Sequence, residues 1–343
     1  MLGRTNRQWI LVQRPEGMFS EENFKWVESP VPSVKDGEFL LRNLWLSCDP
    51  TQMGWMKVDT YVPKVPLGEV MRAFGIGEVV ESRNSGFRVG DLLAGLIGWQ
   101  DYVVIGVDNL NAVQRVPPNV PPELTLSLFG LTGMTAYFGV TDIGKVAAGE
   151  TFVVSSAAGA VGSIAGQIAK IHGAHVVGIA GGRAKCDWLR KEAGFDVAID
   201  YRSEKVGSRL SEVCPNGIDV YFDNVGGEIL DDVLTRINLH ARIVLCGAIS
   251  GYASRQYRAL TNYYTLIGKR GRMEGFIILD YAPRFGEAAK ALAGWSAEGR
   301  LKQKLDIAVG LENAPKTLAR LFHGENFGKQ LLKIADPAER RPS

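Results

Sequence analysis

Residues 150–200 carry the most regular hydrophobic pattern of the chain. Thr151–Ser155 is a short apolar run of the kind that forms a buried parallel strand. Small residues then fill a turn, and apolar residues recur at helical spacing from Val161 to Ile171, with Gly173 placed to end the helix. A second apolar run, His175–Ile179, follows. This order predicts one strand–turn–helix–strand unit.

Apolar runs and helical patterns continue to alternate after this unit. Strands are expected at residues 196–200, 219–223, 241–245 and 273–278, and helices at 228–237 and 283–298; a further strand candidate, 329–334, ends the segment that begins near residue 302. Strands that alternate with helices form parallel sheets with right-handed crossovers. The pattern therefore predicts an α/β fold with a doubly wound parallel sheet.

The first 125 residues follow a different pattern, in which short strand candidates are separated by Gly, Pro and Asp. These candidates are Gln8–Gln13, Glu38–Trp45, Gly75–Val80 and Tyr102–Ile105. They predict a small β-rich domain. Pro117–Pro122 breaks the pattern and marks a linker, and Leu126–Val140 after it is predicted to be helical.

The turn of the strand–turn–helix unit fits the pattern G-x-G-x-x-G with its first glycine replaced by Ala157. Gly159 would let the backbone approach a diphosphate, and Gly162 would let the helix pack closely on the strand. The diphosphate would then meet the N–H groups at the positive end of the helix. A plain structural turn is the alternative, but the flanking strands and helix favour a dinucleotide site.

The end of the second strand indicates which dinucleotide is bound. An NAD site usually has an acidic residue about 20 residues past the glycines, yet residues 180–186 contain no carboxylate. Arg183 and Lys185 stand there instead, in the first turn of a predicted helix, where cations are normally disfavoured. A bound 2′-phosphate would reverse that preference. NADP(H) is therefore favoured over the alternative of two solvated surface side chains.

Composition and charge narrow the class of protein. At 343 residues the chain is long enough for two domains, and its net charge of +2 gives no electrostatic footprint for nucleic acid. No apolar run is long enough to span a bilayer, and residues 1–7 lack the apolar core of a signal peptide. A cytoplasmic protein without a membrane partner is expected.

Cysteines and histidines show no metal-ligand spacing. Cys48, Cys186, Cys214 and Cys246 lie far apart, as expected of reduced thiols, and the four histidines form no H-E-x-x-H pattern. We therefore expect no metal site. No nucleophile elbow, general-base histidine or carboxylate pair stands out either, which suits hydride transfer by a nicotinamide cofactor.

Two loops after predicted strands carry candidate polar groups. Asn224 follows the strand at 219–223, and Tyr252 lies shortly after the strand at 241–245. Ligands of doubly wound sheets bind beyond the carboxyl ends of the strands, so both residues are expected near the cofactor. A turn role for Asn224 and a simple packing role for Tyr252 remain alternatives.

Taken together, these motifs resemble the zinc-free branch of the medium-chain dehydrogenase/reductase superfamily that includes prostaglandin reductase, leukotriene dehydrogenase and alkenal double-bond reductases. The resemblance covers nearly the whole chain. Its blocks are Leu46–Pro50, Leu67–Met71, Ala157–Gly162, Gly178–Gly182 with Lys185 and Cys186, Phe222–Gly227, Cys246–Ser250, Arg272–Phe276 and Gly324–Gly328. The G-H-E block of the superfamily's zinc enzymes has no counterpart here.

The resemblance implies a domain layout and a set of cofactor contacts. A GroES-like substrate domain would comprise residues 1–125, completed by about 305–343, and a Rossmann NADP(H)-binding domain would comprise residues 126–304. The family's NADPH contacts fall on Gly159, Ala160, Val161, Gly162, Gly182, Lys185, Tyr201, Asn224, Cys246, Ile249, Tyr252, Phe276, Ile278 and Asn326. A homodimer is the family's usual state.

The implied reaction is the reduction of an α,β-unsaturated ketone or aldehyde, with Tyr252 as the candidate donor to the developing enolate oxygen. One segment departs from the family: Thr51 replaces its usual tyrosine near the substrate, and Trp55 follows. We expect these two residues to shape the substrate pocket. The alternatives are a zinc-free NADPH quinone reductase and, in a different class, a non-catalytic NADPH-binding protein.

Overall fold

The apolar runs between residues 151 and 275 form one six-stranded parallel sheet in the computed structural model, which describes residues 5–253 and 258–337. In sheet order the strands are β10 (Val197–Asp200), β9 (His175–Ala180), β8 (Thr151–Ser155), β11 (Ile218–Asp223), β12 (Ile237–Leu245) and β13 (Arg272–Gly275). The chain adds strands on one side of β8 and then returns to add β11 on the other side. The crevice between β8 and β11 is therefore the topological switch point, where such sheets bind ligands.

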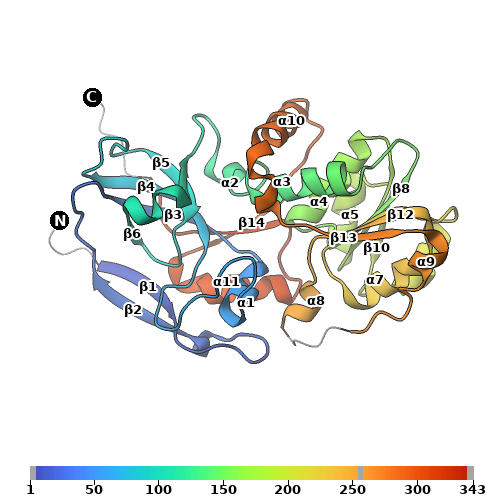
Figure 1. Ribbon diagram of the computed structural model, residues 1–343, viewed down its shortest axis with the longest axis horizontal. Coiled ribbons are helices and arrows are strands. Elements are labelled where there is room, and N and C mark those ends of the chain that lie inside the picture. The colour runs from blue at the N-terminus through green and yellow to red at the C-terminus, as the bar shows by residue number, and fades with distance from the viewer. Residues whose placement is uncertain (1–4, 254–257, 338–343) are drawn as a thin grey trace. The chain divides into compact units, whose positions relative to one another are not determined.

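Helices cover both faces of this sheet, as predicted for a doubly wound fold (Figure 1). Phe152 and Val154 of β8 point into a core shared with one set of helices, whereas Val153 points into the core on the opposite face. This alternation explains why the strand is apolar at every position. The first set is α3 (Leu131–Phe138), α4 (Ala160–Ile171), α5 (Arg183–Lys191) and α10 (Phe285–Ala297); the second is α6 (Val206–Val213), α7 (Gly227–Leu234) and α9 (Thr265–Lys269).

The β-rich part of the chain forms a second sheet, whose strands β3, β4, β5, β6 and β7 pair antiparallel. Leu44, Ile76 and Leu331 lie in its buried core. A Cβ at Gly75 would lie 2.4 Å from the carbonyl oxygen of Trp45, so glycine permits the close approach of β4 to β3. In sheet order the strands are β14 (Leu305–Val309), β15 (Lys329–Lys333), β3 (Phe39–Ser47), β4 (Phe74–Ser82), β5 (Leu92–Leu96) and β7 (Val113–Arg115). Strand β6 (Tyr102–Ile105) also pairs with β3. Strands β1 (Thr5–Leu11) and β2 (Phe24–Pro30) form a separate antiparallel pair.

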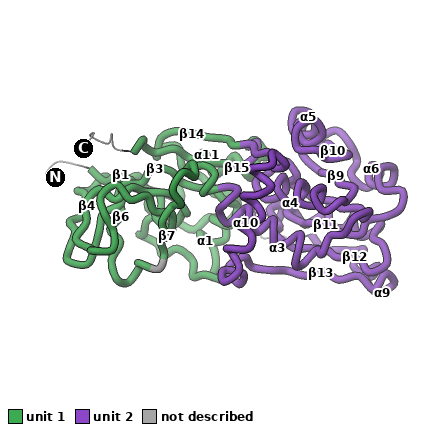
Figure 2. Tube along the Cα trace, turned by 90° about the horizontal axis from the view of Figure 1, so that it is seen from above, with its two compact units in different colours: residues 1–126, 305–325, 330–343 green, residues 127–304, 326–329 purple. Residues whose placement is uncertain are grey.

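Two compact units result, which Figure 2 colours separately. Unit 1 comprises residues 1–126, 305–325 and 330–343, and unit 2 comprises residues 127–304 and 326–329. Residues 338–343, the end of the segment expected to complete the first domain, lie outside the described residues. Short helices complete the units: α1 (Thr51–Lys57), α2 (Pro122–Thr125) and α11 (Ala314–Phe322) begin in unit 1, and α8 (Ile249–Tyr252) lies in unit 2.

The helix expected over Leu126–Val140 was wrong at its start. The chain turns over residues 126–130, and α3 begins only at Leu131. The amide of Gly133 and the hydroxyl of Thr132 both donate to the carbonyl of Ser127, which folds the chain back before the helix starts. After Phe138 the helix widens into a π-helical turn over Gly139–Ile143.

The strand expected over residues 273–278 was too long. Strand β13 ends at Gly275, the last residue paired with β12, and a 3-10 helix begins at Ile278. Strand β13 lies at the sheet edge with a single neighbour, so no pairing holds the chain extended beyond the end of that neighbour. Within the described residues, no helix is long and apolar enough to cross a bilayer.

Candidate cofactor and substrate sites

The turn between β8 and α4 has the geometry of a diphosphate-binding turn. Its left-handed backbone falls on Ser156, with φ of 49°, rather than on Ala157, which holds the place of the first glycine in the motif. A Cβ at Gly162 would lie 2.4 Å from the carbonyl oxygen of Ser156, so α4 packs against the turn only with glycine there. Gly159 is the residue before the first helical turn.

The first turn of α4 presents unpaired N–H groups. Within the described residues, the amides of Ala160, Val161 and Gly162 have no hydrogen-bond partner, and no side chain caps the helix at Gly159. Ala160 and Val161 are partly exposed. Such N–H groups together with the positive end of the helix dipole bind anions. These residues therefore fit the diphosphate of a dinucleotide.

A distant segment, Asn326–Lys329, completes this turn. The amide of Gly328 donates to the carbonyl of Ala158 at 2.9 Å, and Gly328 pairs with Gly159 in an isolated bridge. The side chain of Asn326 donates to the carbonyl of Gly328 at 3.0 Å. Gly328 has φ of 81°, and a Cβ there would lie 1.9 Å from the carbonyl oxygen of Lys304, so glycine is required.

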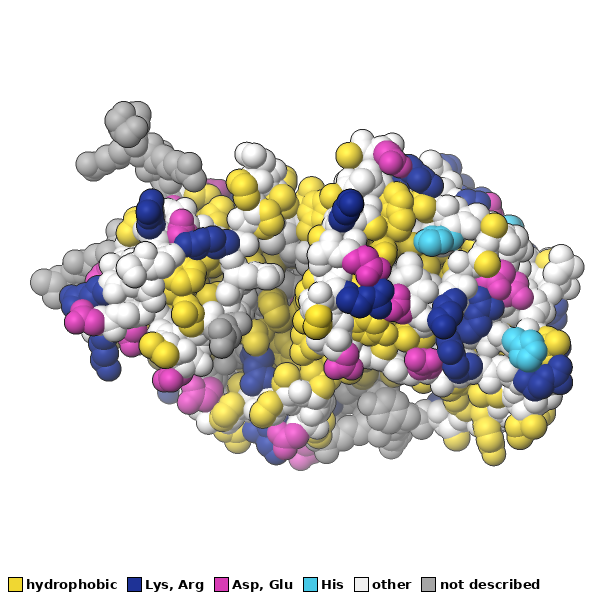
Figure 3. All heavy atoms as spheres, turned by 45° about the horizontal axis from the view of Figure 1, so that its top comes forward, with side chains coloured by type: hydrophobic (Ala, Val, Ile, Leu, Met, Phe, Trp, Pro, Cys, Tyr) yellow, Lys and Arg dark blue, Asp and Glu magenta, His cyan; other side chains and the backbone are white. Residues whose placement is uncertain are grey.

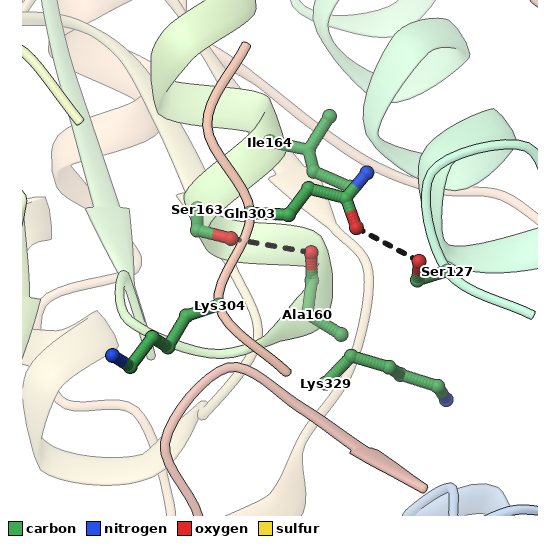
Figure 4. Close-up of a pocket in the computed structure, with 7 residues that line it drawn as sticks. All are labelled: Ser127, Ala160, Ser163, Ile164, Gln303, Lys304 and Lys329. Atoms are coloured by element: carbon green, nitrogen blue, oxygen red, sulfur yellow. Dashed lines mark hydrogen bonds between the residues drawn. The ribbon is translucent and has the colours of Figure 1, made fainter. Parts of the chain in front are cut away.

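A cavity of about 10 Å³ lies beside the same helical turn (Figure 4). Ser127 Oγ donates to Gln303 Oε1 at 2.8 Å on one side of it, and Ser163 Oγ faces the carbonyl of Ala160 on the other. Lys304 and Lys329 extend away from it in opposite directions (Figure 4). A cavity of this size accommodates about one water molecule, so it is not the dinucleotide site.

The predicted 2′-phosphate site lies at the start of α5. Gly182 precedes the helix with φ of 97°, and Arg183 and Lys185 occupy its first turn. The Arg183 side chain is 94% exposed and lies 3.8 Å from Asp187, whereas Lys185 is partly buried. Lys185 is therefore the less exposed of the two predicted cations.

Three residues from the end of β10 flank the same turn. The Tyr201 ring covers Gly181, where a Cβ would lie 2.7 Å from the hydroxyl, and Arg202 Nη1 lies 3.8 Å from a Cβ built at Gly182. Asp200 accepts hydrogen bonds from the amides of Gly182 at 2.7 Å and Arg202 at 3.0 Å. Asp200 and Arg202 were not predicted from the sequence, because only the parallel pairing of β9 and β10 brings them to this turn.

Asp200 places a carboxylate beside this turn, although residues 180–186 contain none. Its burial alone would raise its pKa, but the hydrogen bonds from Gly182 and Arg202 outweigh that effect and lower the pKa. Both backbone N–H groups are thereby occupied by Asp200. The positive charges of Lys185 and Arg202 are the features of this turn that suit a phosphate.

The loops after β11 and β12 are held together at the switch point. The amides of Cys246 and Gly247 donate to the carbonyl of Asp223, and Ser250 bonds the carbonyl of Val225 through its amide and its hydroxyl. Both loops belong to the predicted cofactor set. Burial raises the pKa of the Cys246 thiol to about 12, so it is protonated at neutral pH.

Tyr252 ends the short helix α8 in the second of these loops. Its hydroxyl oxygen accepts a hydrogen bond from the amide of Ala248 at 3.1 Å, and it lies 3.4 Å from a Cβ built at Gly247. Ile249, the other predicted contact of this loop, begins the same helix. The loop thus places a phenol at the carboxyl end of β12, where the cofactor of such a sheet is expected.

Phe276 and Ile278 follow the end of β13 at the same edge of the sheet. Phe276 packs edge-on against Tyr281, with 6.2 Å between ring centroids, and lies 3.0 Å from a Cβ built at Gly139. Ile278 starts the 3-10 helix that leads into α10. Both residues are partly buried, so they are placed to line an apolar surface.

Thr51 and Trp55, the predicted substrate residues, lie on α1 in unit 1. Thr51 Oγ1 lies 3.0 Å from the hydroxyl of Tyr61, a residue that the sequence argument did not single out and that is 48% exposed. Trp55 is buried, its indole N–H has no partner in the described residues, and the Arg72 guanidinium lies 5.5 Å from the ring centroid. The paired hydroxyls of Thr51 and Tyr61 are thus the accessible polar groups beside Trp55.

Metal-ligating side chains and surface charges complete the description of these sites. Among the described residues, no group of three or more His, Cys, Asp or Glu could hold a metal ion. Lys and Arg side chains are interspersed with Asp and Glu on the face drawn in Figure 3. Interspersed charges of both signs are the ordinary composition of a globular protein surface.

Comparison with known proteins agrees with this geometry. Residues 7–113 match a family described as the N-terminal domain of oxidoreductase, and residues 160–294 match one described as zinc-binding dehydrogenase. The chain is 40% identical over 337 residues to the NADPH-dependent curcumin reductase of Escherichia coli strain K12, covering 96% of this chain and 97% of that protein. It is 36% identical over 338 residues to the NADP(+)-dependent 2-alkenal reductase of Nicotiana tabacum, covering 96% and 98%.

A solved structure gives the same relationship. The crystal structure of CurA from Vibrio vulnificus in complex with NADPH matches with a TM-score of 0.91 and 39% identity, over 96% of this chain and 100% of that one. Its fold and the matches above extend over both units. The chain therefore belongs to the medium-chain dehydrogenase/reductase superfamily, in the branch of the prostaglandin and alkenal reductases.

Proposed function

We propose that this protein uses NADPH to reduce the C=C bond of α,β-unsaturated ketones and aldehydes. The observation that carries the proposal is the Tyr252 hydroxyl, held by the Ala248 amide in a loop at the carboxyl end of the Rossmann sheet. Relatives named as curcumin, 2-alkenal and pulegone reductases support this substrate class. A non-catalytic binding protein would not need a hydroxyl placed to donate to a substrate, and Tyr252 has one in this loop.

The residues of unit 2 fit NADPH at both ends. The amides of Ala160, Val161 and Gly162 would bind the diphosphate, and Lys185 and Tyr201, with Arg202, would bind the 2′-phosphate. Asn224, Cys246, Ile249, Phe276, Ile278 and Asn326 would surround the nicotinamide end. When bound, NADPH supplies the hydride that is delivered to the β-carbon of the substrate.

Tyr252 would stabilise the charge that develops on the carbonyl oxygen. Because its oxygen accepts the Ala248 N–H, the phenol O–H is polarised and becomes a stronger donor to an enolate. A donor placed before the reaction needs no reorganisation as charge develops. On the substrate side we assign Thr51 and Trp55, with the Tyr61 hydroxyl that pairs with Thr51.

The test is NADPH consumption with a panel of enones, enals, quinones and saturated alcohols. We expect turnover of enones and enals, with saturation of the C=C bond confirmed by mass spectrometry of the product. Turnover of quinones alone would replace the proposal with a quinone reductase. Tight NADPH binding without turnover of any compound would indicate a non-catalytic binding protein.

A further inference from the structure

A buried carboxylate, Asp223, lies at the end of β11 beside the switch point and has no role in the proposed mechanism. It is 1% exposed, and its Oδ1 accepts four hydrogen bonds. The donors are Tyr221 Oη at 2.9 Å, Ser155 Oγ at 3.1 Å, the Val225 amide at 3.0 Å and the Gly226 amide at 2.9 Å. Asp223 therefore joins two strands to the loop that contains Asn224.

Ser155 passes this restraint to Asn224. Its hydroxyl donates to Asp223 and accepts the Asn224 amide at 2.9 Å, and its carbonyl accepts the Asn224 side-chain Nδ2 at 2.8 Å. A carbonyl can only accept a hydrogen bond, so the NH2 group of Asn224 must face Ser155. The amide oxygen of Asn224 then faces away, and it has no partner within the described residues.

We propose that Asp223 and Ser155 are positioning residues that fix the Asn224 amide oxygen as an acceptor for the nicotinamide riboside half of NADPH. An amide oxygen held in this way recognises an O–H or N–H donor, which is either a ribose hydroxyl or the carboxamide NH2 of that half. The inference rests on the proposed function, because it takes NADPH as the ligand. It assigns the buried pair a role in cofactor orientation in addition to its role in the core.

The binding test compares NADPH with adenosine 2′,5′-diphosphate, which keeps the 2′-phosphate but lacks the nicotinamide riboside. Ser155→Ala and Asn224→Ala should each raise the Kd of NADPH by roughly fivefold to tenfold. The Kd of adenosine 2′,5′-diphosphate, which makes no contact with the changed group in this proposal, should stay within about twofold. Equal weakening of both ligands would overturn the proposal, because it would mean general damage to the fold.

A double-mutant cycle tests whether Ser155 acts through Asn224. In the Ser155→Ala/Asn224→Ala double variant, NADPH affinity should fall no further than in Asn224→Ala alone, because the acceptor is already lost. If the double variant instead loses NADPH affinity by the product of the two single factors, Ser155 and Asn224 act independently and the positioning role is overturned. Asp223→Asn combined with Asn224→Ala gives the same cycle if Ser155→Ala does not fold.

The 3-acetylpyridine analogue of NADPH, which lacks the carboxamide NH2, identifies the donor. If Asn224→Ala also weakens binding of this analogue, the donor to the Asn224 oxygen is a ribose hydroxyl. If Asn224→Ala weakens binding of NADPH but not of the analogue, the donor is the carboxamide NH2. Either result supports the proposal.

Asp231→Asn is the matched control. Asp231 on α7 is also a buried carboxylate with several hydrogen bonds, but its partners are Thr261 and Asn262. This variant should lower the melting temperature without changing the ratio of the two Kd values. Failure of the wild type to bind NADPH would instead refute the proposed function, so the two failures are distinguishable.

Discussion

Lys185 is partly buried in the first turn of α5, beside a turn that Tyr201 and Arg202 flank. Its ammonium group would interact with the 2′-phosphate, which NADH lacks. We expect Lys185→Ala to raise the Kd of NADPH by roughly tenfold to a hundredfold, because a hydrogen bond to a charged group contributes a binding free energy of that size. The Kd of NADH should stay unchanged. Fluorescence titration measures both constants.

Arg190→Ala is the control for Lys185. Arg190 lies on the same helix but pairs with Asp187 at 2.7 Å. This variant should preserve the preference for NADPH. Equal affinities of the wild type for the two cofactors would contradict the phosphate site altogether.

Tyr252 carries the second prediction at this scale. Tyr252→Phe keeps the ring but removes the hydroxyl that accepts from Ala248, so turnover on an enone should fall by roughly tenfold to a thousandfold. The Kd of NADPH should change by less than about threefold, because the ring still packs. Steady-state kinetics and cofactor titration separate the two effects. Unchanged kcat would remove Tyr252 from the mechanism.

Single positions show where sequence reasoning is sufficient and where it is not. Gly159 and Gly162 were placed correctly in the turn, because a strand and a helix of clear period flank them. The left-handed residue is Ser156, which the motif does not mark, because serine rarely adopts positive φ. Arg202 and Asp200 reach the α5 turn only through pairing between β9 and β10, and one sequence does not reveal that register.

Arg242 links three segments at the amino end of the parallel sheet. From β12 it makes two bonds to Glu150, at 2.9 and 2.6 Å, and donates to the carbonyls of Gly144 and Lys145. Burial alone would raise the Glu150 pKa, but the Arg242 hydrogen bond and the Ala147 amide outweigh it and hold the pKa below the ordinary 4.5. The pair therefore stabilises the fold above pH 4.5, and the contribution is lost as pH falls through the lowered pKa.

We expect Arg242→Met to lower the free energy of unfolding by about 2 kcal/mol at neutral pH. The difference in the free energy of unfolding should narrow as the pH falls below 4.5 and through the lowered pKa of Glu150. Urea unfolding of both proteins at neutral and acidic pH measures this difference in the free energy of unfolding. Arg300→Met, which removes an exposed pair with Glu298, should change stability by less than about 0.5 kcal/mol. A difference that widens in acid would contradict this account.

For helices and strands, the period of the hydrophobic pattern and the burial of the element decide whether the sequence predicts it. The strands β8, β9 and β11 are buried on both faces and stand out as apolar runs. Strand β14, by contrast, is half exposed at a sheet edge, so its pattern is weak and it was missed. Helix α1 was missed as well, since it has only seven residues.

The whole chain bears on metal dependence. The described residues hold no cluster of metal ligands, and burial raises the pKa of Cys186 and Cys214 to about 11, so these thiols are protonated at neutral pH. We expect turnover of an enone to be unchanged after prolonged treatment with a strong chelator. Loss of activity that added zinc restores would show a metal requirement.

We also propose that the protein forms a homodimer, as its resemblance to the superfamily implies. In unit 2, strand β13 is an edge strand, and Tyr263, Tyr264 and Ile267 are 60%, 60% and 79% exposed. Exposed apolar side chains and an unpaired sheet edge each favour association. Light scattering after size exclusion should give twice the 37.4 kDa of one chain. A mass of one chain at micromolar concentration would refute the proposal.

The bridge between Gly159 and Gly328 has a consequence for the order of events during synthesis. The two residues are about 170 positions apart, and a ribosome adds about 5–20 residues per second, so on the order of 10–30 s separate their appearance. During that interval the carbonyl of Ala158 lacks its Gly328 partner. Nascent chains stalled before residue 326 should therefore bind NADPH weakly, and cofactor capture should follow the emergence of Gly328 from the ribosome.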